Sequence, residues 1–246
     1  MPGTSFDRVA DHYDETRGGE RRGDQVAAAI APWVPEGRVV ELGVGTGVVA
    51  LGLRTRGHGV VGLDLSAGMM RTAVGRLGPR VAQADIDVLP VPDDSVDCAV
   101  FVWVLHLVAD SAATMREAAR VVRQGGRVIA VSADPEHHPD DEIAAAMAPF
   151  KVLSQGSRSV AVLRDGAPES FDLEHDGFTP WAEFEKTAAA EIDLIERRSY
   201  SQLFDLDDER WRTVVEPVLD QLRALPDPDA PRIRRNRNPL LVWRVS

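Results

Sequence analysis

Short apolar runs alternate with amphipathic stretches over the first half of the chain. Residues 39–42, 59–63 and 96–102 are rich in valine and other apolar side chains, as is typical of parallel strands that are buried on both faces. Apolar residues at helical spacing predict helices over residues 22–33, 48–53, 66–76 and 111–123. Strands and helices in alternation predict right-handed crossovers and therefore a parallel sheet.

This alternation stops after residue 132. Residues 133–178 are expected to be an insertion that covers the ligand crevice, because substrate-specific parts commonly lie in such loops. Within the insertion, the pattern predicts a short helix over residues 142–151, a short strand over residues 159–163 and an acidic loop over residues 164–178. Further on we expect a helix over residues 179–190 and a strand over residues 192–198. An amphipathic helix capped by Asp207 is expected over residues 207–222, and a terminal strand over residues 240–245.

The first apolar run leads into a glycine loop, Glu41-Leu42-Gly43-Val44-Gly45-Thr46-Gly47. Glycines let the backbone turn tightly and approach a ligand without hindrance from a Cβ atom. The helix that follows directs its free amide groups back toward the loop. An electron-rich ligand group is therefore expected at the carboxyl end of this strand.

Two further strands each end in an acidic residue. Asp64 follows the second strand, where a carboxylate can bind both hydroxyls of a ribose. Asp85 follows the third expected strand, residues 80–84, and precedes the apolar Ile86. This second acid can accept a hydrogen bond from an adenine amino group.

Together these motifs resemble the class I S-adenosylmethionine-dependent methyltransferases, in particular the group that acts on small molecules. The resemblance covers about residues 6–132, including a lead-in at residues 6–14 that closes over the cofactor in the family, and a fifth strand at residues 125–131. It implies a Rossmann-like α/β fold: a seven-stranded, mostly parallel sheet with helices on both faces and a C-terminal antiparallel hairpin. It also implies S-adenosyl-L-methionine as the cofactor.

The same resemblance implies a set of cofactor-binding residues. They are Tyr13, Glu41, Gly43, Gly45, Gly47, Asp64, Leu65, Met69, Asp85, Ile86 and Val102. Two of them have a structural alternative, since Tyr13 can serve only to dock the N-terminal arm, and methionines such as Met69 often only fill the core.

His106 is the histidine that the fourth strand delivers to the same crevice. A general base needs such a position and a pKa near neutrality, so His106 is the catalytic candidate. The alternative is that it packs against the next helix. No metal site is expected at His137 and His138, because adjacent histidines in a proline-bounded loop rarely bind the same ion. The basic run Arg232–Arg237 is expected to be a solvated edge that balances acidic neighbours, with phosphate binding as the alternative.

The net charge and the cysteine content of the chain reduce the range of partners and functions to be expected. The 246 residues include 28 basic and 39 acidic side chains, a formal net charge of -11, which disfavours nucleic acid and anionic membranes as partners. Cys98 is the single cysteine, and we expect it to be an inert core residue. No signal segment or membrane span is expected, so a cytoplasmic protein with a small-molecule acceptor is predicted; a homodimer is left open.

We therefore predict one methyltransferase domain over residues 1–246. Residues 1–35 are expected to form an N-terminal arm and helix, and residues 36–132 the cofactor-binding core. Residues 133–178 are the insertion, and residues 179–246 complete the sheet. The expected reaction transfers a methyl group to an oxygen, nitrogen or carbon atom. One alternative is a noncatalytic adenosyl-binding partner or sensor. The other is an NAD(P)-dependent oxidoreductase, although the loop lacks the G-x-G-x-x-G spacing and that activity leaves Asp85 unexplained.

Overall fold

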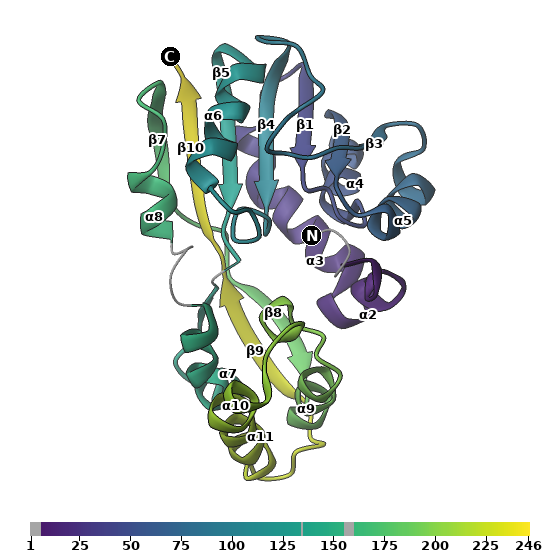
Figure 1. Ribbon diagram of the computed structural model, residues 1–246, viewed down its shortest axis with the longest axis vertical. Coiled ribbons are helices and arrows are strands. Elements are labelled where there is room, and N and C mark those ends of the chain that lie inside the picture. Colours follow the sequence, from purple (N-terminus) through teal and green to yellow (C-terminus); the bar gives the residue numbers. More distant parts are fainter. Residues whose placement is uncertain (1–5, 134, 155–159) are drawn as a thin grey trace. The chain divides into compact units, whose positions relative to one another are not determined.

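The computed structural model describes residues 6–133, 135–154 and 160–246, which form two compact units (Figure 1). Unit 1 consists of Met1–Asp134, Ser159–Pro180 and Asn238–Ser246, and unit 2 consists of Pro135–Arg158 and Trp181–Arg237. Each unit is described by itself below. The single domain expected over residues 1–246 stays a prediction.

A seven-stranded sheet forms the centre of unit 1. Its strand order is β3-β2-β1-β4-β5-β10-β7, and β1 to β5 are parallel, whereas β10 is antiparallel to both β5 and β7. This confirms the predicted Rossmann-like fold class. The strands are β1 (Arg38–Leu42), β2 (Gly59–Asp64), β3 (Val81–Gln83), β4 (Val96–Val102), β5 (Val122–Val131), β7 (Phe171–Phe178) and β10 (Pro239–Val245).

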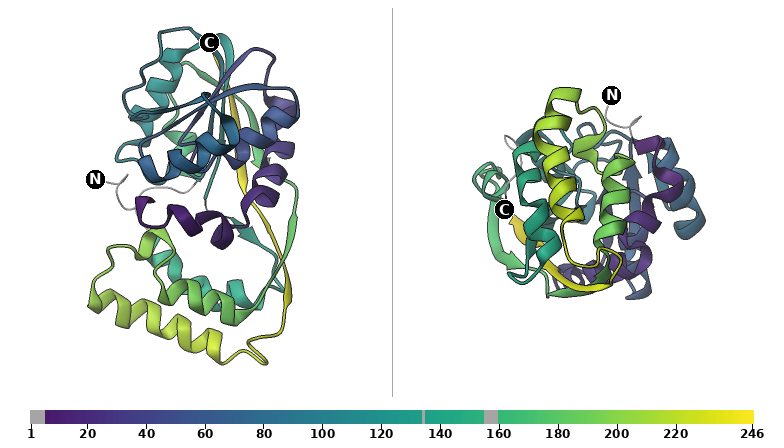
Figure 2. Two further views of the ribbon diagram at one scale, coloured as in Figure 1. Left: turned by 90° about the vertical axis from the view of Figure 1, so that its right-hand side faces the viewer. Right: turned by 90° about the horizontal axis from the view of Figure 1, so that it is seen from below.

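Helices cover both faces of this sheet (Figure 1, Figure 2). Successive residues of a strand point to opposite faces. In β4, Ala99 and Phe101 therefore join one apolar cluster, and Cys98, Val100 and Val102 join the other. α6 (Ser111–Val121) and α8 (Val160–Asp165) supply the first cluster, and α3 (Gly19–Ile30), α4 (Val48–Thr55) and α5 (Ala67–Leu77) supply the second. A short helix, α2 (Tyr13–Arg17), precedes α3.

The partner of the last strand differs from the prediction. β10 pairs with β7, residues 171–178, which were expected to be part of an acidic loop. Residues 192–198, expected to be a strand, instead lie mostly in α9 (Ala188–Glu196), and residues 160–163 are helical. β7 is an edge strand, and edge strands tolerate charged side chains. Its polar composition therefore concealed it, while capping of α9 by the Thr187 side chain favours a helix there.

Unit 2 packs helices on a small antiparallel sheet. Its strand order is β6-β9-β8, with β6 (Glu136–His137), β8 (Ala182–Lys186) and β9 (Arg232–Arg237). Besides α9, its helices are α7 (Glu142–Met147), α10 (Asp208–Arg210) and α11 (Glu216–Arg223). Asp207 caps α10 by accepting a hydrogen bond from the Arg210 amide, as predicted. The core of this unit contains apolar residues of its helices, including Ile143, Ile195, Val215 and Leu222.

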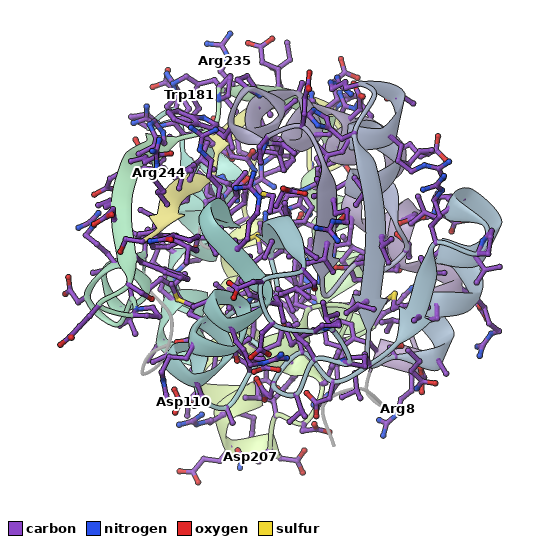
Figure 3. The ribbon with its side chains drawn as sticks, turned by 90° about the horizontal axis from the view of Figure 1, so that it is seen from above. Arg8, Asp110, Trp181, Asp207, Arg235 and Arg244 are labelled. Atoms are coloured by element: carbon purple, nitrogen blue, oxygen red, sulfur yellow. The ribbon has the colours of Figure 1, made fainter. Side chains whose placement is uncertain are left out.

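Most arginines of β9 face acidic partners on the surface of unit 2. Arg235 pairs with Glu183 at 2.5 Å and extends away from the ribbon (Figure 3). Arg237 forms a bidentate pair with Glu136. These contacts agree with the expected charge balance along an exposed edge.

Arg234 departs from that expectation because it is buried. Its Nε atom donates to both carboxylate oxygens of Asp141, at 3.0 and 2.8 Å, and its guanidinium lies 3.5 Å from Glu191. Lys186 pairs with Glu191 at 2.6 Å, and His137 lies 3.6 Å from Asp141. The sequence pattern missed this network because Asp141 and Glu191 are far from β9 in the sequence. Burial raises the pKa of Asp141, but interactions with His137, the Ala144 amide and Arg234 outweigh burial and lower this pKa to about 2.

Replacing Asp141 with alanine should destabilise the protein strongly. The change leaves the Arg234 guanidinium buried without its main partner, which costs about 3–5 kcal/mol. Urea unfolding followed by circular dichroism measures the loss. Glu183→Ala is the control, because that exposed pair with Arg235 is worth about 0–1 kcal/mol. Equal losses in the two variants would contradict a structural role for the buried network.

Candidate functional site

The glycine loop joins β1 to α4 in a conformation that requires glycine. Gly43, Gly45 and Gly47 have positive φ angles of 75°, 56° and 83°, a region that other residues rarely adopt. A Cβ atom on Gly43 would come within 2.4 Å of Val104. Among the described residues, no heavy atom beyond Gly45 and its two chain neighbours lies within 4 Å of the position that a Cβ atom of Gly45 would take. The loop is therefore closed toward the sheet at Gly43 and open at Gly45.

Hydrogen bonds tie this loop to the end of β2. The amides of Gly43 and Val44 both donate to the Leu63 carbonyl, at 2.8 and 2.9 Å. The amide of Gly45 donates to Oδ2 of Asp64 at 2.8 Å, while Oδ1 accepts from the Ser66 amide at the same distance. Burial raises the pKa of Asp64, and these hydrogen bonds oppose the rise. The Asp64 carboxylate is thus held rigidly beside the loop.

Glu41 is a buried carboxyl group at the base of the loop. Its side chain is 2 % exposed. Burial raises its pKa to about 8, the nearby charge of Asp64 raises it further, and a hydrogen bond from the Ala50 amide in the first turn of α4 opposes the rise. In the described part of the chain, Oε2 of Glu41 has no hydrogen-bond partner. A buried polar atom of this kind is a candidate ligand contact.

The first helix of the motif begins without a side-chain cap. Gly47 occupies the N-cap position of α4 and supplies no side-chain cap, whereas the buried Glu41 accepts a hydrogen bond from the Ala50 amide in the first turn. Free amides and the helix dipole favour an electron-rich ligand group at this point. In contrast, Ser66 caps α5 by accepting from the Met69 amide at 3.2 Å.

Two carboxylates fasten the N-terminal arm to this site. Asp7 accepts from the Ser66 hydroxyl at 2.6 Å and from the Gly68 amide at 2.7 Å, and these bonds lower the pKa of Asp7. Asp14 accepts from the Thr46 hydroxyl at 2.6 Å and pairs with Arg76 at 2.6 Å. The arm is therefore anchored both to the glycine loop after β1 and to the turn between β2 and α5. Sequence reasoning assigned these acids no contact, because their partners lie far along the chain.

Most of the predicted site residues lie at the carboxyl edge of the sheet. Val102 is the last residue of β4, and Leu65, which is 40 % exposed, follows β2. Asp85 and Ile86 follow β3; Asp85 is exposed, whereas Ile86 is buried in the core. Their roles toward a ligand stay predictions.

Three other candidates have packing contacts of their own. Met69 is buried in α5, in agreement with a core role. The Tyr13 ring contacts Phe6 edge-on, with 6.4 Å between the ring centroids, which agrees with its docking the arm. His106 is half-buried in a turn after β4. No contact of these residues excludes a ligand role, so cofactor binding by Tyr13 and Met69 and catalysis by His106 stay predictions.

Trp103 is a feature of this edge whose geometry the sequence did not reveal. It follows β4 directly, has a φ angle of 54°, and is stacked by the Arg22 guanidinium at 3.6 Å from the ring centroid. A positive φ in a bulky residue has no signature in composition or spacing.

Comparison with known proteins agrees with this geometry. Residues 40–130 match a family model described as a methyltransferase domain. This segment contains the glycine loop, Asp64, Asp85 and strands β4 and most of β5. Over these residues the chain resembles a methyltransferase domain.

Curated proteins that are similar to the chain include demethylmenaquinone methyltransferases. The chain is 35% identical to that of Mycolicibacterium paratuberculosis over 129 residues, which are 50% of this chain and 56% of the relative. It is 42% identical to that of Corynebacterium kroppenstedtii over 94 residues, 38% of this chain and 41% of the relative. The chain thus matches only about half the length of these relatives.

Solved structures resemble the chain over a larger part of its length. A putative type II methyltransferase from Anaeromyxobacter dehalogenans has a TM-score of 0.62 at 21% identity, covering 89% of this chain and 94% of that one. An S-adenosylmethionine-dependent methyltransferase from Thermotoga maritima has a TM-score of 0.58 at 20% identity, covering 100% and 99%. At these identities the likeness shows the fold. Within the described residues, no helix has the length and apolar character needed to cross a membrane.

Replacing Glu41 with glutamine should change how stability depends on pH. The unfolded carboxyl loses its proton near pH 4.5 and the folded one near pH 8, so the folded state holds an extra proton between these values. The free energy of unfolding should therefore fall as pH rises through this window, by about 1.4 kcal/mol per unit of pKa difference. Glutamine removes this contribution.

Urea unfolding at pH 5, 6, 7 and 8 measures the effect. The Glu41→Gln variant should show a flatter dependence than the unaltered protein, and Glu36→Gln, at an exposed position before β1, should leave the dependence unchanged. The same slope in all three proteins would contradict a raised pKa at Glu41.

Proposed function

We propose that this protein binds S-adenosyl-L-methionine and transfers its methyl group to a small-molecule acceptor. The observation that carries the proposal is the bond from the Gly45 amide to the Asp64 carboxylate. This bond joins the glycine loop to the second strand's acid within the segment that matches the methyltransferase model. It agrees with a crevice at the carboxyl ends of parallel strands, where ligands bind in doubly wound sheets.

The residues at this edge fit such a cofactor in three places. Glu41 has a buried oxygen without a partner in the described chain, which suits the ammonium group at the methionine end. Asp64 presents a rigid carboxylate that suits the two ribose hydroxyls. Asp85 is exposed beside the apolar Ile86, which suits an adenine ring and its amino group. Gly45 leaves open space at the loop between these positions.

The chemistry requires little from the protein. S-adenosylmethionine supplies a methyl carbon that is already electrophilic, so the residues of this chain act chiefly by holding two reactants in line and excluding water. The rigid loop, with its amides bonded to Leu63 and Asp64, suits the positioning role. We propose His106 as the base for an acceptor that must lose a proton.

Acceptor choice is proposed to lie outside the sheet core. The N-terminal arm is anchored beside the loop through Asp7 and Asp14, and residues 133–178 remain the second candidate. Within that range, residues 171–178 form β7, so a deletion test must spare them. The net charge of -11 favours a small acceptor over nucleic acid. We propose a cytoplasmic protein, and a homodimer is the oligomer to test for.

Asp64→Ala should weaken binding of S-adenosylhomocysteine by about 2 kcal/mol or more, because hydrogen bonds to a charged group are worth about 1.5–3 kcal/mol each. Isothermal titration calorimetry measures this loss, with thermal unfolding as the check on folding. Asp24→Ala is the control, since Asp24 pairs with Arg56 on the surface of α3. Because Asp64 also holds the loop, the 2′-deoxy analogue of the ligand should lose less affinity than the ligand itself. Equal losses for both ligands would contradict the ribose assignment.

Turnover against a panel of small acceptors tests the activity. Mass spectrometry should detect a methylated product from at least one phenol, amine or activated carbon acid, together with S-adenosylhomocysteine. A protein that binds S-adenosylhomocysteine tightly and methylates none of a broad panel would favour a noncatalytic binding protein. A protein that binds no adenosyl ligand would refute the proposed function.

A further inference from the structure

Trp103 holds an unfavourable backbone conformation immediately after β4. Its φ angle of 54° lies in the left-handed region, which is a true outlier for a bulky residue. Its amide donates to the Val131 carbonyl at 3.0 Å, continuing the pairing between β4 and β5. Such strain persists only where the surroundings impose it, and it is concentrated at ligand sites.

The indole ring is fixed in place, and its polar atom is unsatisfied. The Arg22 guanidinium lies 3.6 Å from the ring centroid, a favourable cation–π distance. Within the described residues, the buried Nε1 atom of Trp103 has no hydrogen-bond partner. A buried donor without an acceptor is costly and rare in native proteins. Arg22 therefore holds the indole ring in place, while the indole N–H has no acceptor among the described residues.

The ring of Trp103 packs against the apolar cluster that contains Val44 of the glycine loop, and Val48, the first residue of α4, packs against the same cluster. Gly23, the residue after Arg22, lies against Val48. Trp103 and Arg22 therefore lie on the face of the sheet that carries the start of α4. The indole donor, the guanidinium charge and the positive end of the α4 dipole all favour a negatively charged group.

We infer that Trp103, through its indole N–H, binds the carboxylate of the amino-acid end of the adenosyl ligand, and that Arg22 positions the ring and adds positive charge. The inference rests on the proposed function and adds a residue to the site. It explains why a strained, unsatisfied tryptophan stands beside a glycine loop. A carboxylate oxygen would meet a donor from which water is already excluded, so little desolvation opposes the bond.

The test compares two ligands that differ only in this carboxylate. S-adenosylhomocysteine carries it, and S-adenosyl-3-thiopropylamine lacks it. Trp103→Phe keeps an aromatic ring for Arg22 to stack on and removes only the indole donor. By calorimetry, this variant should bind S-adenosylhomocysteine about tenfold more weakly and the decarboxylated ligand with unchanged affinity.

Two further variants separate this role from general damage. Trp33→Phe makes the same chemical change at a half-buried tryptophan that stacks on His175, and it should alter neither affinity. Arg22→Gln should reduce the preference for the carboxylate-bearing ligand in the same direction as Trp103→Phe. It tests the inference independently if the phenylalanine variant folds poorly.

Each outcome decides between the two claims. If the unaltered protein binds both ligands and neither Trp103→Phe nor Arg22→Gln changes their affinity ratio, the inference is wrong and the proposed function stands. An equal loss for both ligands would show a structural role only and would also overturn the inference. If the unaltered protein binds neither ligand, the proposed function fails and this inference fails with it.

Discussion

The Asp64 carboxylate is the contact on which the site depends. It accepts one hydrogen bond from the Gly45 amide and another from the Ser66 amide, so it fixes the loop after β1 against the turn after β2. The same turn bonds to Asp7 of the N-terminal arm, through the Ser66 hydroxyl and the Gly68 amide. The half-buried Asp64 therefore links two segments directly, and Ser66 extends the link to the N-terminal arm. Burial raises the pKa of Asp64, and its amide partners keep the ionised form accessible.

Charge is distributed differently in the two units. In unit 1, Glu41 is buried and Asp64 is half-buried, both have raised pKa values, and Oε2 of Glu41 has no hydrogen-bond partner in the described chain. In unit 2, Asp141 is buried beside Arg234 and His137 and has a lowered pKa. An acid with a raised pKa and no partner is typical of a functional site, whereas a paired acid with a lowered pKa is typical of a structural one.

The sequence predicted the elements whose signal is local. The valine-rich strands β1, β2 and β4, the glycine loop and the caps at Ser66 and Asp207 all follow from residues within a few positions of one another. It failed where pairing over long distances decides the structure. β7 carries charged residues because it is an edge strand, and residues 188–196 are helical although Ile192 and Leu194 alternate like a strand. The strain at Trp103 and the burial of Arg234 likewise arise only from contacts distant in the sequence.

The position of β10 has a consequence for how the chain folds during synthesis. β10 lies between β5 and β7 and is the only neighbour of β7 in the sheet, yet the whole segment Trp181–Arg237 of unit 2 is translated between β7 and β10. Until β10 emerges from the ribosome, β5 presents an open edge of apolar residues such as Val128 and Ile129. Unpaired strand edges of this kind invite pairing with other chains. The nascent protein therefore passes through an interval in which rapid folding of the residues between the two strands, or a chaperone, protects it from aggregation.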